Sequence, residues 1–116
     1  MKKVTSYYFK TESGREPVRE FIDSLAPKTQ RKFFIVRKLL EEFGHRLPYP
    51  HAENVGDEIY ELRFSGIEGT VRVLYFFFYR DKVVFTNGFL KKTNKLPPGE
   101  KTLAIARRKA YLSFHK

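Results

Sequence analysis

The feature that most constrains the fold of this chain is a β-rich stretch that covers residues 59–95. β-Branched and aromatic residues dominate three runs in it, and short turn-like segments separate these runs. The runs cover residues 59–64, 71–79 and 83–90. We therefore expect three consecutive antiparallel strands.

The two turns suggest a register in which basic residues form a row across the sheet. Centring the first turn on residues 67–68 places Arg63 opposite Arg72. A two-residue turn at residues 81–82 places Arg72 opposite Lys91. Like charges that face each other on a sheet are destabilising, by roughly 0.2–1 kcal/mol per pair. Such a row indicates a polyanion ligand.

The same register sorts the apolar residues, because side chains alternate between the faces of a strand. One face forms the expected core, and its residues are Tyr60, Leu62, Phe64, Val71, Val73, Tyr75, Phe77, Val84 and Leu90. The face that carries the cations continues as Leu74, Phe76, Phe78, Phe85 and Phe89. This second face is too apolar to remain in water as one patch. Either the C-terminal part of the chain or another protein must cover it.

The segments before the sheet predict one further strand and a helical hairpin. Residues 4–10 are rich in aromatic and β-branched residues, which favours a short strand. Pro17 and Pro27 each suit the first turn of an amphipathic helix, and Gly44 suits the C-terminal cap of the second one. Residues 45–58 show no periodicity and are expected to form a connecting loop.

A last amphipathic helix is expected after the proline pair at residues 97–98. Its apolar stripe would consist of Leu103, Ala106, Ala110 and Phe114. The resulting order is β-α-α-β-β-β-α, which is an α+β fold with an antiparallel meander covered by a helical hairpin. Residues 1–116 are expected to form a single domain.

Composition restricts the function classes. The sequence contains no cysteine, which excludes disulfides and thiolate metal sites, and its three histidines match no metal motif. Its longest apolar run has about seven residues, too few for a membrane helix, so a cytoplasmic protein is expected. The net charge is +10. A charge of this size favours nucleic acid or an acidic partner.

Three sequence blocks resemble the RelE/HigB family of toxins, within the RelE/ParE superfamily. They are YELRF at residues 60–64, VRVLYF at residues 71–76 and NGFLKKTNKLPP at residues 87–98, and A-x-x-R follows at residues 104–107. The resemblance implies a RelE-like fold and a cytoplasmic mRNA endoribonuclease that inhibits translation without a metal or cofactor. It also implies the partners: mRNA, the 70S ribosome and a cognate HigA-like helix-turn-helix antitoxin, which holds the toxin in a hetero-oligomeric complex.

The resemblance also implies site residues. Arg72 matches the arginine that binds the scissile phosphate, and Lys91 and Lys92 match a basic pair at the end of the following strand. Arg63 matches a basic position that is common in the family. Glu61 stands where some members place a lysine, and the tyrosine that others place near the C-terminus has no obvious counterpart here. The identity of the general base is therefore open.

Cleavage of RNA by its own 2′-hydroxyl needs a base, charge stabilisation and an acid. Arg72 suits the stabilising role, because a guanidinium binds phosphate through a bidentate fork. Lys91, among like charges, could transfer protons. Glu61 is the first carboxylate candidate for the base and Glu53 the second. Glu61 could instead orient Arg63 or Arg72, and both arginines could simply flank acidic neighbours.

The remaining cations suggest a wider RNA-binding surface, which we expect to consist of Lys95, Arg107, Arg108 and Lys109. Two other functions stay open. One is a ParE-like DNA gyrase inhibitor with the same fold, and the other is a non-catalytic RNA-binding domain. Relatives with the gyrase activity generally lack the basic row, which argues against the first of these here.

Overall fold

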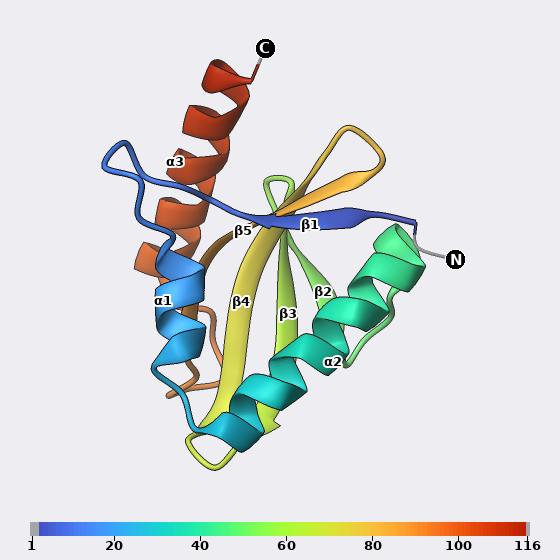
Figure 1. Ribbon diagram of the computed structural model, residues 1–116, viewed down its shortest axis with the longest axis vertical. Coiled ribbons are helices and arrows are strands. Elements are labelled where there is room, and N and C mark those ends of the chain that lie inside the picture. Colours follow the sequence, from blue (N-terminus) through green and yellow to red (C-terminus); the bar gives the residue numbers. More distant parts are fainter. Residues whose placement is uncertain (1–2, 116) are drawn as a thin grey trace.

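The fold is a five-stranded sheet with helices on both faces (Figure 1). The computed structural model describes residues 3–115. Along the chain, the elements are β1 (Thr5–Tyr8), α1 (Pro17–Asp23), α2 (Pro27–Phe43), the 3₁₀ helix η1 (Gly44–Arg46), β2 (Ala52–Gly56), β3 (Ile59–Gly66), β4 (Gly69–Phe78), β5 (Lys82–Leu90) and α3 (Pro98–Phe114). The strand order is β1-β5-β4-β3-β2, and among the strand pairs of residues 3–115 only β1–β5 is parallel. The predicted α+β class is confirmed.

The helical hairpin begins and ends where the sequence predicts. Pro17 and Pro27 are the first residues of α1 and α2, and Gly44 caps α2 with a φ of 56°. The start of α2 is held by Glu68, in the turn between β3 and β4. Its carboxylate accepts hydrogen bonds from the Ala26 N–H and the Thr29 hydroxyl, each at 2.6 Å. A side chain distant in sequence therefore caps this helix.

The core between the hairpin and the sheet contains most of the predicted residues. Leu62, Val71, Val73 and Tyr75 are buried there against α1 and α2. Phe33 of α2 lies at the centre of the core and is fully buried. Its ring contacts those of Phe34, Phe64 and Phe85.

The expected connecting loop at residues 45–58 is wrong, because this segment contains η1 and the edge strand β2. β2 pairs antiparallel with β3, with Glu53 opposite Glu61. Its sequence, AENVG, has neither the β-branched content nor the alternation that identifies a strand. Pairing with β3 makes it a strand in spite of its composition.

The predicted register is correct for the first hairpin and wrong for the second. Arg63 lies opposite Arg72, as expected. Arg72, however, lies opposite Phe89, because residues 79–81 form the turn and Thr86 is an extra residue on β5. Lys91 instead donates its backbone N–H to the Thr70 carbonyl, at 2.8 Å.

This bulge also exchanges two residues between the faces of the sheet. Phe85, expected beside the cations, lies in the hairpin core, and Val84 lies on the opposite face. Bulges shift the alternation of side chains by one residue, which explains the exchange. Phe89 and Leu90, beyond the bulge, lie on the faces that were predicted.

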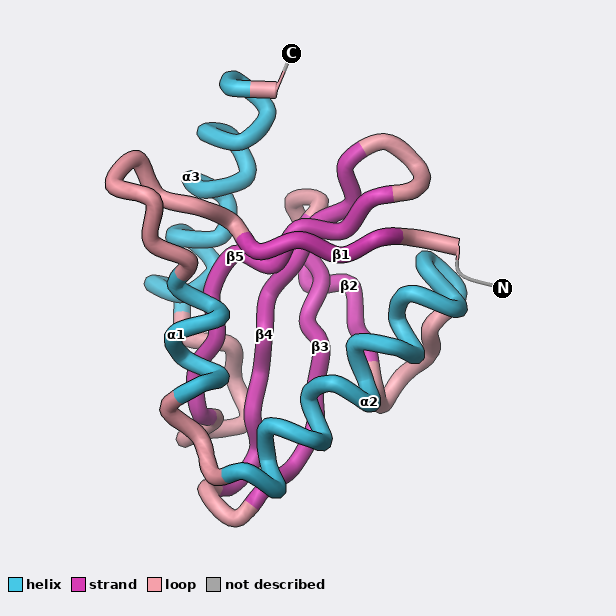
Figure 2. Tube along the Cα trace, in the orientation of Figure 1, coloured by secondary structure: helices cyan, strands magenta, loops and turns pink. Residues whose placement is uncertain are grey.

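α3 covers the second apolar face, so of the two coverings that the sequence left open the structure shows the C-terminal part of the chain (Figure 2). Leu74, Phe76 and Phe78 pack there with Ala104 of α3. The predicted stripe of α3 is wrong, because Ala104 faces the sheet whereas Phe114 is 86% exposed. The small Ala104 side chain lets the helix backbone approach the sheet closely.

Hydrogen bonds to the bulge hold α3 in place. The Asn87 side-chain amide donates to the Glu100 carbonyl at 3.1 Å and to its carboxylate at 2.9 Å. Arg107 Nη1 donates to the Thr86 carbonyl at 2.8 Å. Among the described helices, none is long and apolar enough to cross a membrane.

Candidate functional site

Four charged side chains from three adjacent strands form a continuous chain of ion pairs. They are Arg72 of β4, Glu61 and Arg63 of β3, and Glu53 of β2. Arg72 Nη1 lies 3.4 Å from Glu61 Oε2, and Arg63 Nη2 lies 2.6 Å from Glu53 Oε2. Arg63 Nε donates to Glu61 Oε1. Glu61 therefore connects the two arginines.

The chain of ion pairs runs from the interior to the surface. The side chains of Arg72 and Glu61 are 2% and 1% exposed, whereas those of Arg63 and Glu53 are 20% and 42% exposed. Arg63 also lies over the ring of Tyr49, at 5.3 Å from its centroid. Buried ion pairs are weak evidence for stability, because desolvation can exceed the Coulombic gain. This burial therefore calls for another explanation.

Two atoms at the buried end make no hydrogen bond within the described part of the chain: Arg72 Nε and Glu61 Oε2. Arg72 Nη2 donates to the Asn94 carbonyl at 3.3 Å. Asn94 belongs to the loop of residues 91–97, which connects β5 to α3. This loop closes the site over a guanidinium that retains a free N–H donor.

Burial and the neighbouring carboxylates act in opposite directions on the pKa of Arg63. Partial burial by itself favours the neutral form of Arg63. The hydrogen bond and the negative charge of Glu61, together with the charge of Glu53, outweigh this effect and raise the pKa of Arg63 above its ordinary value. The direction of this shift shows that the two carboxylates stabilise the guanidinium charge more than burial opposes it.

The structure brings together three of the five predicted catalytic residues, which are Arg63, Arg72 and Glu61. It does not place Lys91 in their row, as the register shows. Lys92 and Lys95 lie in the 91–97 loop and line a cavity of about 800 Å³. Asn94, which contacts Arg72, has no motif that could have identified it in the sequence.

The basic residues predicted on α3 are divided between packing and solvent. Besides its bond to the Thr86 carbonyl, Arg107 lies 5.5 Å from the ring centroid of Phe9, and burial lowers its pKa. Arg108 lies 6.0 Å from the ring centroid of Phe76. Lys109 is exposed. The stems of both arginines thus complete the α3 interface, as amphipathic side chains commonly do.

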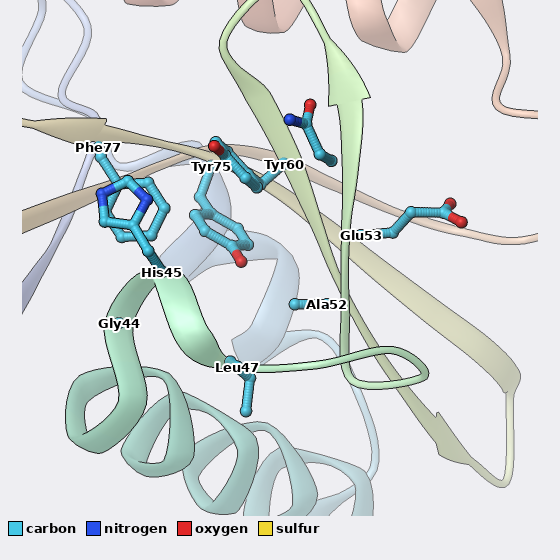
Figure 3. Close-up of a pocket in the computed structure, with 9 residues that line it drawn as sticks. Gly44, His45, Leu47, Ala52, Glu53, Tyr60, Tyr75 and Phe77 are labelled. Carbon is cyan, nitrogen blue, oxygen red and sulfur yellow. The ribbon is translucent and has the colours of Figure 1, made fainter.

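A second cavity, of about 310 Å³, lies on the hairpin side of the sheet (Figure 3). His45 and Phe77 stack at its wall with ring centroids 3.5 Å apart. Burial raises the pKa of Tyr75, which also lines the cavity, above its ordinary value. Within residues 3–115, no group of three or more metal-ligating side chains could hold a metal ion.

Comparison with protein families gives a match over most of the chain. A family model described as "Phage derived protein Gp49-like (DUF891)" matches residues 20–109. The match extends from within α1 to within α3, so it includes the whole chain of ion pairs and the 91–97 loop. No curated protein matches the chain.

Proposed function

We propose that this chain, which belongs to the Gp49-like family of phage-derived proteins, is a toxin with a RelE-like fold that cleaves mRNA without a metal ion. The family match and the sequence blocks shared with RelE/HigB toxins support the toxin assignment. The element order, with a helical hairpin on one face of the sheet and a final helix on the other, agrees with it.

The observation that carries the proposal is the free Nε–H of buried Arg72. A guanidinium binds phosphate best through two parallel N–H groups, one of which can be Nε–H. Arg72 already has a carboxylate beside Nη1, and its Nε–H is unused. A scissile phosphate would accept a hydrogen bond from this unused Nε–H.

Phosphate can reach Arg72 only if the 91–97 loop moves, because Asn94 covers the guanidinium. Once phosphate neutralises Arg72, Glu61 keeps Arg63 as its partner and its Oε2 becomes available as a base. Glu61 then accepts the proton of the 2′-hydroxyl, the 2′-oxygen attacks phosphorus, and the P–O5′ bond breaks. The leaving 5′-oxygen takes a proton from a cation of the moved loop, either Lys91 or Lys92. The products are a 2′,3′-cyclic phosphate and a 5′-hydroxyl.

Each catalytic group needs to supply only part of the rate enhancement. One positioned acid or base contributes about 10²–10⁴-fold to the rate. Arg72 would stabilise the negative charge that develops on the phosphorane, where water is excluded and electrostatic effects are strong. Lys95, Arg107, Arg108 and Lys109 would add attraction for the RNA backbone. The ribosome, as a polyanion, and an antitoxin that keeps the toxin inactive are the partners we expect.

A second candidate is a toxin that binds its target without cutting RNA, such as a ParE-like gyrase inhibitor. The burial of Arg72, 2% exposed and already paired with Glu61, favours this alternative. In that case the ion pairs would serve the fold alone. The two candidates differ in whether Arg72 is needed for strand scission.

The test adds the purified protein to a defined message, with and without programmed ribosomes, and maps the new 5′ ends. Arg72→Lys is the informative variant, because it keeps a cation beside Glu61 but removes the bidentate fork. Arg80→Lys, at an exposed turn residue, is the matched control. We expect cuts with the wild type and the control, and a loss of about 100-fold or more with Arg72→Lys.

Circular dichroism of all three proteins separates lost chemistry from lost folding. Cuts that persist at the wild-type rate in a folded Arg72→Lys protein would contradict the proposed role of Arg72. No cuts with wild-type protein under either condition would favour the binding toxin. A DNA supercoiling assay with gyrase would then be the next experiment.

A further inference from the structure

β5 has a free edge next to the larger cavity. β1 pairs with β5 only from Lys82 to Phe85, so residues 86–90 have no neighbouring strand on that side among the described residues. In Figure 1, β5 passes between α1 and α3, and the 91–97 loop follows its end. An unpaired edge of this kind is a template for another extended chain.

The register shows which backbone groups point outward. Lys91 and Thr70 form a hydrogen-bonded pair, and such pairs alternate along an antiparallel ladder. Phe89 therefore bonds to β4, whereas Gly88 and Leu90 direct their N–H and C=O groups away from it. These two residues offer two donors and two acceptors at the spacing of a β-strand.

The cavity beside this edge has a volume of about 800 Å³, within the range of ligand pockets. Apolar residues line it, among them Phe21, Phe89 and Leu96. The Phe21 ring lies directly against the backbone of Gly88, where an added Cβ would come within 2.6 Å of Phe21 Cδ2. Glycine at residue 88 thus permits an apolar wall to stand beside the strand edge.

Charge selects the kind of chain that fits. Lys92 and Lys95 are exposed and line the cavity, and Glu100 is its only described acidic lining residue. The whole protein carries a net charge of +10. An acidic segment is therefore attracted both by Lys92 and Lys95, which form the basic rim of the cavity, and by the positive net charge of the whole protein.

We propose that the free edge of β5, between α1 and the 91–97 loop, binds an extended acidic segment of a partner protein by β-strand addition. Backbone hydrogen bonds to Gly88 and Leu90 position the segment. The apolar side chains of the segment, which share one face of the added strand, pack against Phe21 on the α1 side of the sheet, and the acidic side chains of its other face pair with Lys92 and Lys95. The proposal does not depend on RNA cleavage.

A nucleic acid is the other polyanion that the two lysines could attract. It would use the lysines and leave the strand edge unused, because a sugar-phosphate backbone does not present alternating N–H and C=O groups. The apolar wall and the free ladder groups favour a peptide. A single-stranded RNA is therefore tested beside the peptide as a competing ligand.

The probe is a synthetic eight-residue peptide that alternates valine and glutamate, and binding is followed by fluorescence anisotropy. We expect saturable binding and slower hydrogen exchange of the Gly88 and Leu90 amides. A peptide with N-methylated valines keeps its charge and side chains but cannot form the ladder. Losing two hydrogen bonds, each contributing about 1 kcal/mol, should weaken its binding about 30-fold.

Two double variants test the rim. Lys92→Glu/Lys95→Glu should weaken peptide binding about tenfold or more, because it places like charges beside the peptide. Lys28→Glu/Lys32→Glu changes the net charge equally at two exposed residues of α2 and should bind within about twofold of wild type, because salt screens distant charges. All four residues are exposed, so both proteins should fold.

Three results would overturn the proposal. The N-methylated peptide could bind as well as the parent, or the two double variants could lose affinity equally, which would leave only general electrostatic attraction. Finally, a single-stranded oligouridylate could bind with loss in Lys92→Glu/Lys95→Glu while the peptide does not bind. That last result would assign the cleft to nucleic acid. Failure of RNA cleavage would leave the peptide measurements unaffected.

Discussion

The chain of ion pairs predicts an asymmetry in stability between its two buried members. Glu61 has two arginine partners, whereas Arg72 has one carboxylate and the Asn94 carbonyl. Glu61→Gln therefore leaves Arg72 as a buried charge without a counterion. Removing one member of a buried pair typically costs about 3–5 kcal/mol. Arg72→Met leaves Glu61 paired with Arg63, and losing one charged contact costs about 1.5–3 kcal/mol.

The double variant Glu61→Gln/Arg72→Met removes both buried charges. Glu61→Gln/Arg72→Met buries no unpaired charge, so it should be more stable than Glu61→Gln alone although it carries one more substitution. Glu53→Gln is the matched control, since the Glu53 side chain is 42% exposed. An exposed pair contributes only about 0–1 kcal/mol.

Urea unfolding at pH 7, followed by circular dichroism, measures these differences. With a slope of about 2 kcal/mol per molar urea, Glu61→Gln should lower the midpoint by roughly 2 M, and Glu53→Gln by less than about 0.5 M. Equal midpoints for Glu61→Gln and Glu53→Gln would refute the reasoning. So would a double variant that is less stable than Glu61→Gln.

Three further predictions concern the fold. The pKa of Glu68 is lowered by the hydrogen bond that its carboxylate accepts from the Ala26 N–H. The contribution of Glu68 to folding stability is therefore present above its ordinary pKa of 4.5 and is lost as the pH falls through the lowered pKa. In thermal melts, Glu68→Gln should lose less stability than the wild type over this pH range. Phe33→Ala should destabilise by about 3–5 kcal/mol in urea unfolding, because Phe33 is fully buried. Ala104→Glu should expose the apolar face under α3 and increase binding of a hydrophobic dye, whereas Ala106→Glu, at an exposed residue, should not.

Much of the fold could be predicted from local signals. Pro17, Pro27 and Gly44 mark helix ends through their own backbone restrictions, so those boundaries are visible in the sequence. The three long strands follow from their β-branched and aromatic content. β2 was missed because it becomes a strand only by pairing with β3.

The candidate site was predictable only up to the bulge. Arg63 and Arg72 face each other across a short turn, so their register follows from local sequence. The position of Lys91 depends on the extra residue Thr86, whose bulge is stabilised by the hydrogen bonds of Thr86 and Asn87 with Arg107 and Glu100 of α3. A bulge that depends on tertiary contacts leaves no periodic signal. The burial of Arg72 under Asn94 likewise arises from loop packing that no motif encodes.

The parallel pairing of β1 with β5 has a consequence for synthesis of the chain. Thr5 aligns with Lys82, so the first strand leaves the ribosome long before its partner strand exists. Contacts this distant in sequence form late and slow folding, because loop closure must precede them. The nascent chain therefore cannot complete its sheet until residues 82–85 have emerged from the ribosome, and β1 has no partner strand until then.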